Sequence, residues 1–343
     1  MVDIGSMNLS ELTAFLTGNG FERFRAKQVL DWIRHSAADF DEMANIPARL
    51  RDWLKENAYL AAAEIVRVQR SRIDGTEKYL YRLFDGEFVE GVLMRYRHGL
   101  SICISTQVGC KMGCTFCATG KSGFSRSLTA SEMVAQIRSA ELRCDERISN
   151  VVLMGMGEPF DNYDNVIRFL RLVSSEDSLN IGMRHMTVST CGIVPRMMEF
   201  ADLNLQCGLS VSLHAPTDEQ RSLTMPINRR YPIDEVISAS RYYTQKTHRR
   251  ITFEYALISG VNDSDECAGK LASLLKGLLC HVNLIPVNSV TGTGYQKSSR
   301  QRQQAFVKIL SDRGVNATVR RTLGSDIDAS CGQLKRNYTK GDA

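Results

Sequence analysis

The sequence predicts an α/β protein built on a parallel sheet, and three observations support this fold class. From residue 101 onward, six segments of strand character alternate with six of helical character, the pattern of repeated βα units. Three cysteines follow the first of these strands. Before residue 100 the pattern is different, with helical periodicity first and short alternating strands after it. Six βα units could curl into a partial barrel or form an open sheet, and periodicity leaves that choice open.

The N-terminal residues 8–57 have the apolar spacing of short helices. Leu9 and Leu12 begin a helical pattern, and Pro47 is placed to open a later helix. We therefore expect a small helical domain over 1–60. Two roles remain open for it, a packing cap on the main domain or a contact with RNA.

The region 61–98 predicts a small antiparallel sheet that links this domain to the rest of the chain. Asp-Gly pairs at 74–75 and 85–86 favour tight turns between runs of alternating apolar residues. The region also carries a basic set, namely Arg67, Arg70, Arg72, Lys78, Arg82, Arg95 and Arg97. Such a set is typical of a solvated face, and a contact with RNA is the sharper alternative.

The region 99–343 holds the βα units. The expected strands cover 101–106, 149–155, 184–190, 206–213, 251–258 and 281–287, with a last strand over 316–321. The expected helices cover 130–143, 163–173, 193–202, 233–246, 264–276 and 299–313. Thr129-Ala-Ser-Glu132 forms a capping-box pattern for the first helix, and Pro232 is placed to open the fourth.

Composition is that of an ordinary globular enzyme. The 343 residues are 43% apolar and 24% charged, with a formal net charge of +5 that is compatible with an RNA partner without requiring one. The start of the chain shows no secretory signal, and no apolar run reaches the roughly 18 residues of a membrane span. We therefore expect a cytoplasmic protein, in which the ten cysteines are reduced thiols and metal ligands.

The cysteine triplet is the strongest chemical signal. Cys110, Cys114 and Cys117 have CxxxCxxC spacing on a loop after a buried strand. Three soft thiolates within eight residues suit one soft centre, either an iron–sulfur cluster or zinc. Structural metal sites usually close all four positions, so three ligands indicate that something else binds at the open position.

Polar residues recur at the ends of the other expected strands. The segments are Met154–Pro159, Ser189–Gly192, Ser212–His214, Glu254–Tyr255 and Pro286–Asn288. Gly155 and Gly157 would let the backbone approach a ligand closely, with Glu158 available for an amine or hydroxyl group. Taken singly, such a glycine is more often part of a turn and His214 more often a core histidine with its hydrogen bonds satisfied.

Two further cysteines lie outside the triplet. Cys103 is seven residues before Cys110, and Cys331 lies in the polar, glycine-containing run 324–333. An exposed cysteine beside a glycine on such a loop fits a reactive thiol, while an inert surface thiol is the plainer alternative.

These motifs together resemble one known family. The segment Cys110–Cys117 looks like the radical S-adenosylmethionine (SAM) signature. The other motifs of the set are Cys103–Cys110, Met154–Pro159, Ser212–His214, Met225–Asn228 and Asp326–Gln333. The set resembles the RlmN/Cfr family of radical SAM adenosine methyltransferases that act on 23S ribosomal RNA. The resemblance covers essentially the whole chain and implies a partial (β/α)6 barrel. Ser330 stands where the family has alanine, and Cys191 stands where serine is usual.

The resemblance implies a cofactor set and its contacts. Cys110, Cys114 and Cys117 would hold one 4Fe–4S cluster, whose fourth iron binds SAM. The residues expected to contact SAM are Gly157, Glu158, Ser189, Ser212, Leu213, His214 and Asn288.

It also implies an unusual covalent mechanism that uses two SAM molecules. One methylates the sulfur of Cys331, and a second yields a radical that removes hydrogen from this methyl group. The carbon radical then adds to adenine and links the protein to RNA. Cys103 would resolve that adduct through a Cys103–Cys331 disulfide, and Glu90, thirteen residues before Cys103, matches the family's proposed proton acceptor.

Within the family, the segment Glu158–Asn165 and Pro286–Asn288 favour an RlmN-like enzyme that methylates carbon 2 of adenine, with Cfr-like methylation of carbon 8 as the alternative. The substrate would be 23S rRNA, with tRNA as an open second substrate. A reducing partner such as flavodoxin or ferredoxin and a monomeric state are expected, and no membrane. From other classes, a zinc-stabilised RNA-binding module, with Cys103 as fourth ligand, and a ferredoxin-like electron carrier are the alternatives.

Overall fold

Ten strands form one continuous sheet in the computed structural model, which describes residues 1–35, 37, 39–176, 178–287, 294–327, 334–335 and 338. Their order across the sheet is β14-β13-β12-β11-β10-β9-β6-β5-β4-β3. The strands are β3 (Glu64–Arg70), β4 (Glu77–Arg82), β5 (Phe88–Tyr96), β6 (Gly99–Cys103), β9 (Ile148–Leu153), β10 (Met186–Thr190), β11 (Gly208–Ser212), β12 (Ile251–Leu257), β13 (Cys280–Pro286) and β14 (Ala317–Val319).

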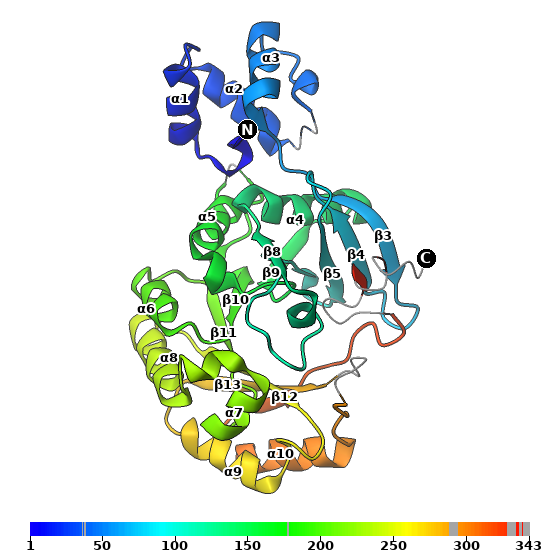
Figure 1. Cartoon of the computed structure of the whole chain (residues 1–343), viewed down its shortest axis with the longest axis vertical. Helices are drawn as coiled ribbons and strands as arrows, with labels where there is room; N and C mark the ends of the chain where they lie inside the picture. Colours follow the sequence, from blue (N-terminus) through cyan, green and yellow to red (C-terminus); the bar gives the residue numbers. More distant parts are fainter. Residues whose placement is uncertain are drawn as a thin grey trace.

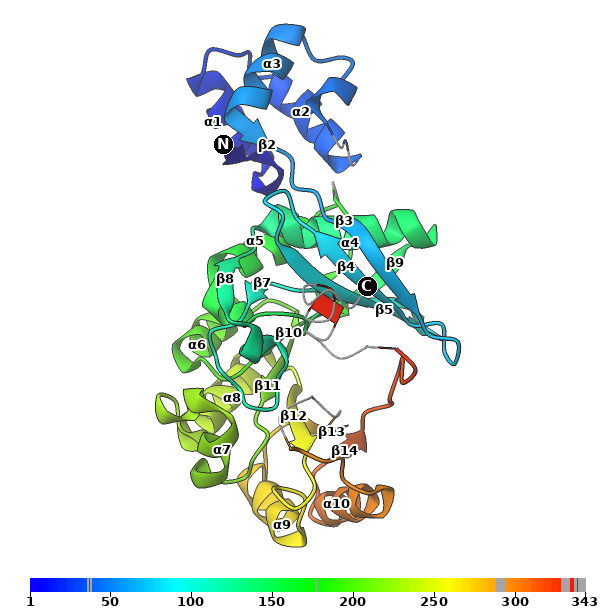
Figure 2. The ribbon, with the colours of Figure 1, turned by 45° about the vertical axis from the view of Figure 1, so that its right-hand side comes forward.

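The direction of the strands changes at β6. From β6 to β14 all neighbours are parallel, whereas β3, β4, β5 and β6 pair in antiparallel fashion. The expected antiparallel strands are therefore present, but they extend the main sheet because β5 pairs with β6. β3 and β14 are the two edges, so the sheet stays open, as a partial barrel does (Figure 2).

Helices cover one face of the parallel strands (Figure 1). They are α4 (Ala130–Cys144), α5 (Tyr163–Ser174), α6 (Val194–Asp202), α7 (Asp218–Thr224), α8 (Ile233–Thr247), α9 (Asp265–Leu274) and α10 (Arg300–Asp312). The six expected helices are confirmed to within a few residues, and α4 begins at the predicted Thr129–Glu132 capping box. The short helix α7, which Thr217 caps, was not predicted.

The N-terminal helices α1 (Leu9–Gly18), α2 (Arg25–Arg34) and α3 (Ala48–Asn57) lie apart from the sheet at one end of the molecule (Figure 1). Their apolar residues form a core of their own, which runs from Ile4 to Ala58. The strands β1 (Val2–Asp3) and β2 (Ala58–Tyr59) pair in parallel and bring the two ends of this region together. Because the N-terminal helical region has a core separate from that of the sheet, it meets the requirement for packing independently.

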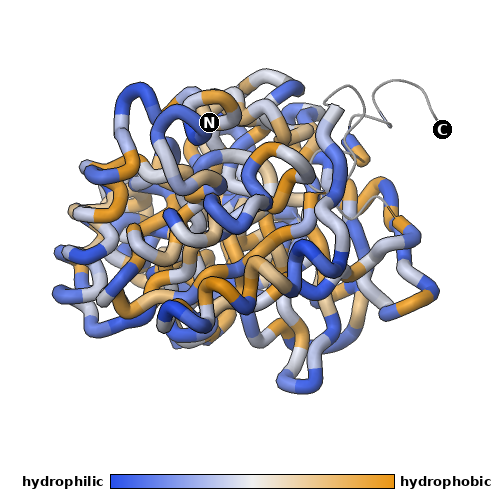
Figure 3. Tube along the Cα trace, turned by 90° about the horizontal axis from the view of Figure 1, so that it is seen from below, coloured by the Kyte–Doolittle hydropathy of each residue, from blue (hydrophilic) through white to orange (hydrophobic). Residues whose placement is uncertain are grey.

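Smaller elements complete the chain. The strands β7 (Gln107–Gly109) and β8 (Phe124–Ser127) form an antiparallel pair on either side of the cysteine loop. The short 3-10 helices are η1 (Ile4–Ser6), η2 (Phe40–Glu42), η3 (Thr119–Ser122), η4 (Pro159–Asn162), η5 (Met183–His185) and η6 (Pro226–Arg229). Apolar segments concentrate in the middle of the molecule (Figure 3). Among the described helices, none combines the length and apolar character that a bilayer crossing demands.

The two faces of the sheet differ in chemistry. Alternate residues such as Val188, Leu209 and Val211 belong to the large core beneath the helices. Because side chains alternate along a strand, their neighbours Ser189, Ser210 and Ser212 turn to the opposite face. That face is the inner side of the partial barrel.

Candidate active site

The cysteine loop follows β7 directly and is held from two sides. The amide of Cys110 donates to Gly123 O at 2.9 Å, which closes the base of the loop. At its tip, the amide of Thr115 donates to Thr224 O at 2.9 Å and so joins the loop to α7. The loop therefore has a defined position at the carboxyl ends of the parallel strands.

The three thiols lie in one electrostatic environment. Burial, together with the nearby Glu158 and Cys117, raises the pKa of Cys110 to about 12. Burial likewise raises the pKa of Cys114 to about 12, with additional contributions from Cys117 and Cys110. A thiol whose pKa is raised this strongly is protonated near neutral pH. It becomes a thiolate when a cation such as iron compensates its negative charge. The donor set therefore fits a soft metal centre.

Within the described ranges, no three His, Cys, Asp or Glu side chains are arranged to hold a single metal ion. In a 4Fe–4S cluster each cysteine binds a different iron, so the thiols surround the cluster rather than converge on one point. Ligation of the cluster by Cys110, Cys114 and Cys117 remains a prediction.

His214 contacts the cysteine loop through an aromatic neighbour. The rings of Phe116 and His214 meet edge to face with centroids 4.8 Å apart. His214 Nδ1 accepts the amide hydrogen of Ala256 at 2.9 Å, and burial lowers the pKa of His214 to about 3. The imidazole is therefore neutral and carries its proton on Nε2. It is a buried histidine with a satisfied hydrogen bond that also borders the site.

Glu158 links two strand ends. One of its carboxylate oxygens accepts from the amide of Phe160 at 3.0 Å, and the other accepts from the amide of Cys191 at 2.7 Å. Burial raises the pKa of Glu158 while these hydrogen bonds lower it. The carboxylate therefore already positions the backbone after β9 and β10, and it retains lone pairs for a ligand.

Gly155 and Gly157, just before Glu158, lie where two parts of the chain pack closely together. A Cβ on Gly155 would lie 2.6 Å from Ile104 O, and one on Gly157, where φ is +108°, would lie 2.6 Å from Gln107 Cβ. These glycines therefore make room for Ile104 and Gln107, which lie on the chain that runs from β6 into β7. The expected close approach of their backbone to a ligand stays a prediction. Contact between Gly157 and SAM remains a prediction.

Arg221 is the main residue of the site that the sequence reasoning missed. This α7 side chain is fully buried and donates to Cys191 O at 2.6 Å, Leu213 O at 3.1 Å and Ser212 O at 3.1 Å. It also donates to Asn228 Oδ1 at 2.9 Å and Tyr231 O at 3.3 Å. Burial lowers the pKa of Arg221, and the Cys191 and Cys114 thiols partly offset this. The guanidinium thus ties the ends of β10 and β11 to α7.

A signal for Arg221 exists in the sequence. Arg221 lies between the motifs Ser212–His214 and Met225–Asn228, and it shares a helical face with Thr224 and Met225, both of which are buried. Cys191, which departs from the family pattern, is also part of this network through its backbone. Burial raises the pKa of its thiol well above the usual range, as does the nearby Glu158.

The remaining candidate SAM contacts lie on or beside the inner face. Ser189 pairs with Ser210, and Ser212 pairs with the buried Glu254. Burial raises the pKa of Glu254, although Arg320 and hydrogen bonds from Asn283 and Ser210 lower it. The side chain of Leu213 packs in the main core, so any contact with SAM would come from its backbone.

Cys103 and Glu90 lie on the same face, one strand apart. Cys103 pairs with Val92, two residues after Glu90 on β5, and it packs with Val92 and Met94. Lys78, expected among solvated or RNA-binding residues, is instead fully buried, with Nζ 2.9 Å from Glu90 Oε2. Local sequence could not reveal this, since the pairing joins two strands.

Asn288 and Cys331 lie outside the described residues. No disulfide joins any two of the described cysteines. Because Cys331 is outside them, the implied Cys103–Cys331 disulfide stays a prediction.

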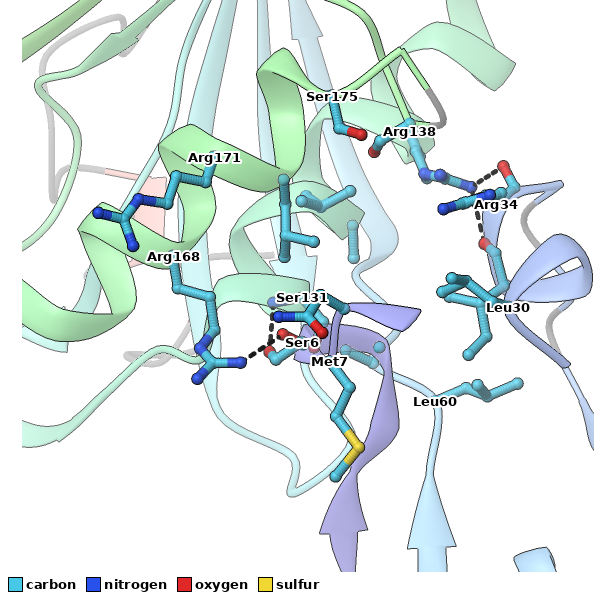
Figure 4. A pocket seen from close by; sticks show the side chains of 18 of the residues that line it. Ser6, Met7, Leu30, Arg34, Leu60, Ser131, Arg138, Arg168, Arg171 and Ser175 are labelled. Atoms are coloured by element: carbon cyan, nitrogen blue, oxygen red, sulfur yellow. Dashed lines mark hydrogen bonds between the residues drawn. The ribbon is translucent and has the colours of Figure 1, made fainter. Parts of the chain in front are cut away.

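A separate cavity of about 980 Å³ lies between the N-terminal helices and α4 and α5 (Figure 4). Of the candidate site residues that the structure describes, none lines it. Arg138 reaches across to Ile33 O at 2.9 Å, and Arg168 donates to Ser6 O at 3.0 Å and pairs with Glu11 at 2.6 Å. These contacts show that the cavity belongs to the junction between the helical region and the sheet.

Comparison with known proteins agrees with this geometry. Residues 104–268 match the model of the radical SAM superfamily, and residues 2–60 match the ribosomal RNA large subunit methyltransferase N-terminal domain. A protein of Clostridium botulinum described as "Probable dual-specificity RNA methyltransferase RlmN" is 53% identical over 99% of this chain and 98% of its own. A protein of Lachnospira eligens with the same description is 51% identical over 98% of this chain and 97% of its own.

A crystal structure of a radical SAM methyltransferase from Sphaerobacter thermophilus superposes with a TM-score of 0.91 at 46% identity, covering 97% of this chain and 99% of that one. The radical SAM match implies SAM and a 4Fe–4S cluster as cofactors, and it favours an enzyme over a zinc-stabilised binding module or an electron carrier. With the cysteine loop at the strand ends and relatives of this identity along its full length, the chain belongs to the RlmN family of radical SAM dual-specificity RNA methyltransferases.

Proposed function

We propose that this enzyme methylates carbon 2 of an adenosine in 23S rRNA, with Cys331 as the methyl carrier. The relatives are described as dual-specificity RNA methyltransferases, and we propose tRNA as the second substrate. The enzyme would act in the cytoplasm as a monomer and receive electrons from a partner such as flavodoxin or ferredoxin. Its parts would be a helical accessory domain over 1–60, an antiparallel link over 61–98 and the catalytic region over 99–343.

The observation that carries this proposal is the anchoring of the chain on both sides of Cys331. Before it, Asp326 accepts from Ser71 Oγ at 2.6 Å and from the amide of Arg72 at 2.8 Å. After it, the amide of Lys335 donates to Glu90 Oε1 at 2.6 Å. Leu323, also before Cys331, packs in the same cluster as Cys103. Leu323 and Lys335, on the two sides of the carrier cysteine, therefore lie beside Cys103 and Glu90, and the turn after β3 holds Asp326.

The residues of the chain would divide the work as follows. Cys110, Cys114 and Cys117 would hold the cluster, which supplies the electron that cleaves SAM. The strand-end residues Gly157, Glu158, Ser189, Ser212, Leu213, His214 and Asn288 would position SAM beside it. His214 is suited to this because its neutral Nε2–H is a donor that does not change with pH near neutrality.

Cys103 and Cys331 would resolve the protein–RNA adduct as a pair. Before this step the adduct would return one electron to the cluster and lose the proton of the attacked ring carbon. The Cys103 thiolate then attacks the Cys331 sulfur, so that a sulfur–sulfur bond forms while the bond from sulfur to the transferred carbon breaks. The electron pair of that bond goes to the carbon, which takes up a proton and becomes the methyl group. A thiol reductant then returns the disulfide to two thiols.

The experiment is mass spectrometry of adenosines from 23S rRNA fragments and tRNA treated with the reconstituted enzyme and SAM that carries a deuterated methyl group. We expect the label on carbon 2. Cys331→Ala should keep its cluster and cleave SAM but methylate no RNA, whereas Cys144→Ala, a thiol on α4 away from the inner face, should methylate normally. A label on carbon 8, or full methylation by Cys331→Ala, would overturn the proposal.

A further inference from the structure

Lys78 and Glu90 form an ion pair inside the protein. The side chains are 0% and 2% exposed, and Nζ lies 2.9 Å from Oε2. Burying two charges is costly, and a pair of this kind is poor evidence for a role in stability alone. Exposed pairs on the same strand, such as Arg82 with Glu64 at 2.6 Å, lack this cost. The position of the Lys78–Glu90 pair is therefore informative.

The pair lies in the part of the sheet where the proposed chemistry takes place. Lys78 is the β4 partner of Val92, and Val92 is the β5 partner of Cys103. Lys78 and Cys103 thus stand in one row of the sheet, two strand spacings or roughly 10 Å apart at their backbones, with side chains on the same face. Glu90 lies two residues before Val92 and shares this face.

Glu90 also touches the segment that follows Cys331. Its Oε2 faces the ammonium of Lys78, and its Oε1 accepts the amide hydrogen of Lys335. The Lys335 ammonium itself pairs with Glu87 at 3.5 Å. The charged and titratable groups near Glu90 therefore include Lys78 from β4, Cys103 from β6, and Lys335 with its partner Glu87.

We propose that Lys78 is a positioning residue for adduct resolution, which holds the Glu90 carboxylate between Cys103 and the segment after Cys331. The inference rests on the proposed function, in which Glu90 is the proton acceptor. The proton leaves the RNA adduct, directly or through the Cys103 thiol, and bonds to a carboxylate oxygen of Glu90. The electron pair of the broken bond stays on the group that loses the proton, so no oxidant or reductant is consumed.

The physical reason is the low polarity around Glu90. A carboxylate buried without a counterion is costly, and a carboxylate is the form that can accept a proton. The ammonium of Lys78 removes this penalty, and the rigid β4–β5 pairing fixes its distance from the carboxylate.

The test uses the full chain with its cluster reconstituted and follows the covalent protein–RNA species over time between pH 6 and pH 9. Lys78→Met should still cleave SAM and methylate Cys331, but at pH 7 it should resolve the adduct about 100-fold more slowly than the natural protein, the scale of a lost general base. Glu90→Gln should stall at every pH, and Lys78→Arg should restore resolution. Lys270→Met, which breaks an exposed pair with Glu266 on α9, should behave as the unmodified enzyme.

Resolution by Lys78→Met at the natural rate, or failure of Lys78→Arg to restore resolution, would overturn the inference and leave Lys78 a structural residue. If Lys78→Met does not fold, Lys78→Gln keeps a hydrogen-bond donor without the charge and is judged by the same two results. Failure of the proposed function is separate, since it appears as RNA methylation by Cys331→Ala.

Discussion

Replacing Arg221 with methionine removes the guanidinium that joins three elements of the site. The change keeps most of the apolar stem of the side chain, so it deletes the hydrogen bonds while creating little empty space. It leaves the carbonyl oxygens of Cys191 and Leu213 and the amide oxygen of Asn228 buried without this donor. The variant therefore measures how firmly the ends of β10 and β11 depend on α7.

The size of the effect follows from these three buried acceptors. Each buried acceptor that loses its partner costs roughly 1–3 kcal/mol, and removal of the costly burial of a charge offsets part of the loss. We expect a destabilisation of about 4 kcal/mol. For a chain of 343 residues the unfolding entropy is on the order of 0.7 kcal/mol/K, so the thermal midpoint should fall by about 6 °C.

The assay is thermal unfolding of the cofactor-free protein, followed by titration with SAM after cluster reconstitution. Arg221→Met should bind SAM more weakly, because Ser212 and His214 follow the strand end that Arg221 holds. Arg229→Met, an exposed arginine on the neighbouring η6, is the control and should shift the midpoint by less than about 1 °C. A shift of Arg221→Met no larger than that of the control would refute the reasoning.

Three further predictions address other parts of the site. His214→Asn should make the stability of the protein depend less on pH on the acid side. In the natural protein the pKa of His214 is about 3 in the folded state and about 6.5 in the unfolded state. The contribution of His214 to stability is therefore complete above pH 6.5 and falls by up to about 1.4 kcal/mol per pH unit below it. Denaturant unfolding at pH 5 and pH 7.5 checks this, and equal losses in both proteins would contradict it. Gly155→Ala should destabilise the protein by about 2 kcal/mol because its Cβ would meet backbone atoms of Ile104 and Ser105, while Gly18→Ala, with open space around it, should not; equal midpoints would argue against the close approach. Cys103→Ala should trap a covalent protein–RNA species visible on a denaturing gel, and recovery of only free RNA would count against its resolving role.

Much of the fold could be predicted because its signals are local. The capping box at Thr129–Glu132 and the alternation of strands and helices after residue 101 depend on near neighbours in the chain, and the structure confirms them. Helix α7 escaped prediction because it has only seven residues, too few for a clear period. The antiparallel strands were predicted as strands, but their union with the parallel sheet depends on the β5–β6 pairing, which local signals do not encode.

The chemistry of the site divides in the same way. Cys110, Cys114 and Cys117 lie within eight consecutive residues, so their order in the sequence was enough to indicate a soft metal centre with an open position. The burial of two charged residues, Lys78 and Arg221, could not be predicted in this way. In the sequence, Lys78 is one of several basic residues of a region expected to face solvent, and Arg221 has the pattern of an ordinary helical arginine. The fold shows that each is buried with its partners. The free energy of a buried charge depends on groups that are distant in the chain, and only tertiary structure brings those groups together.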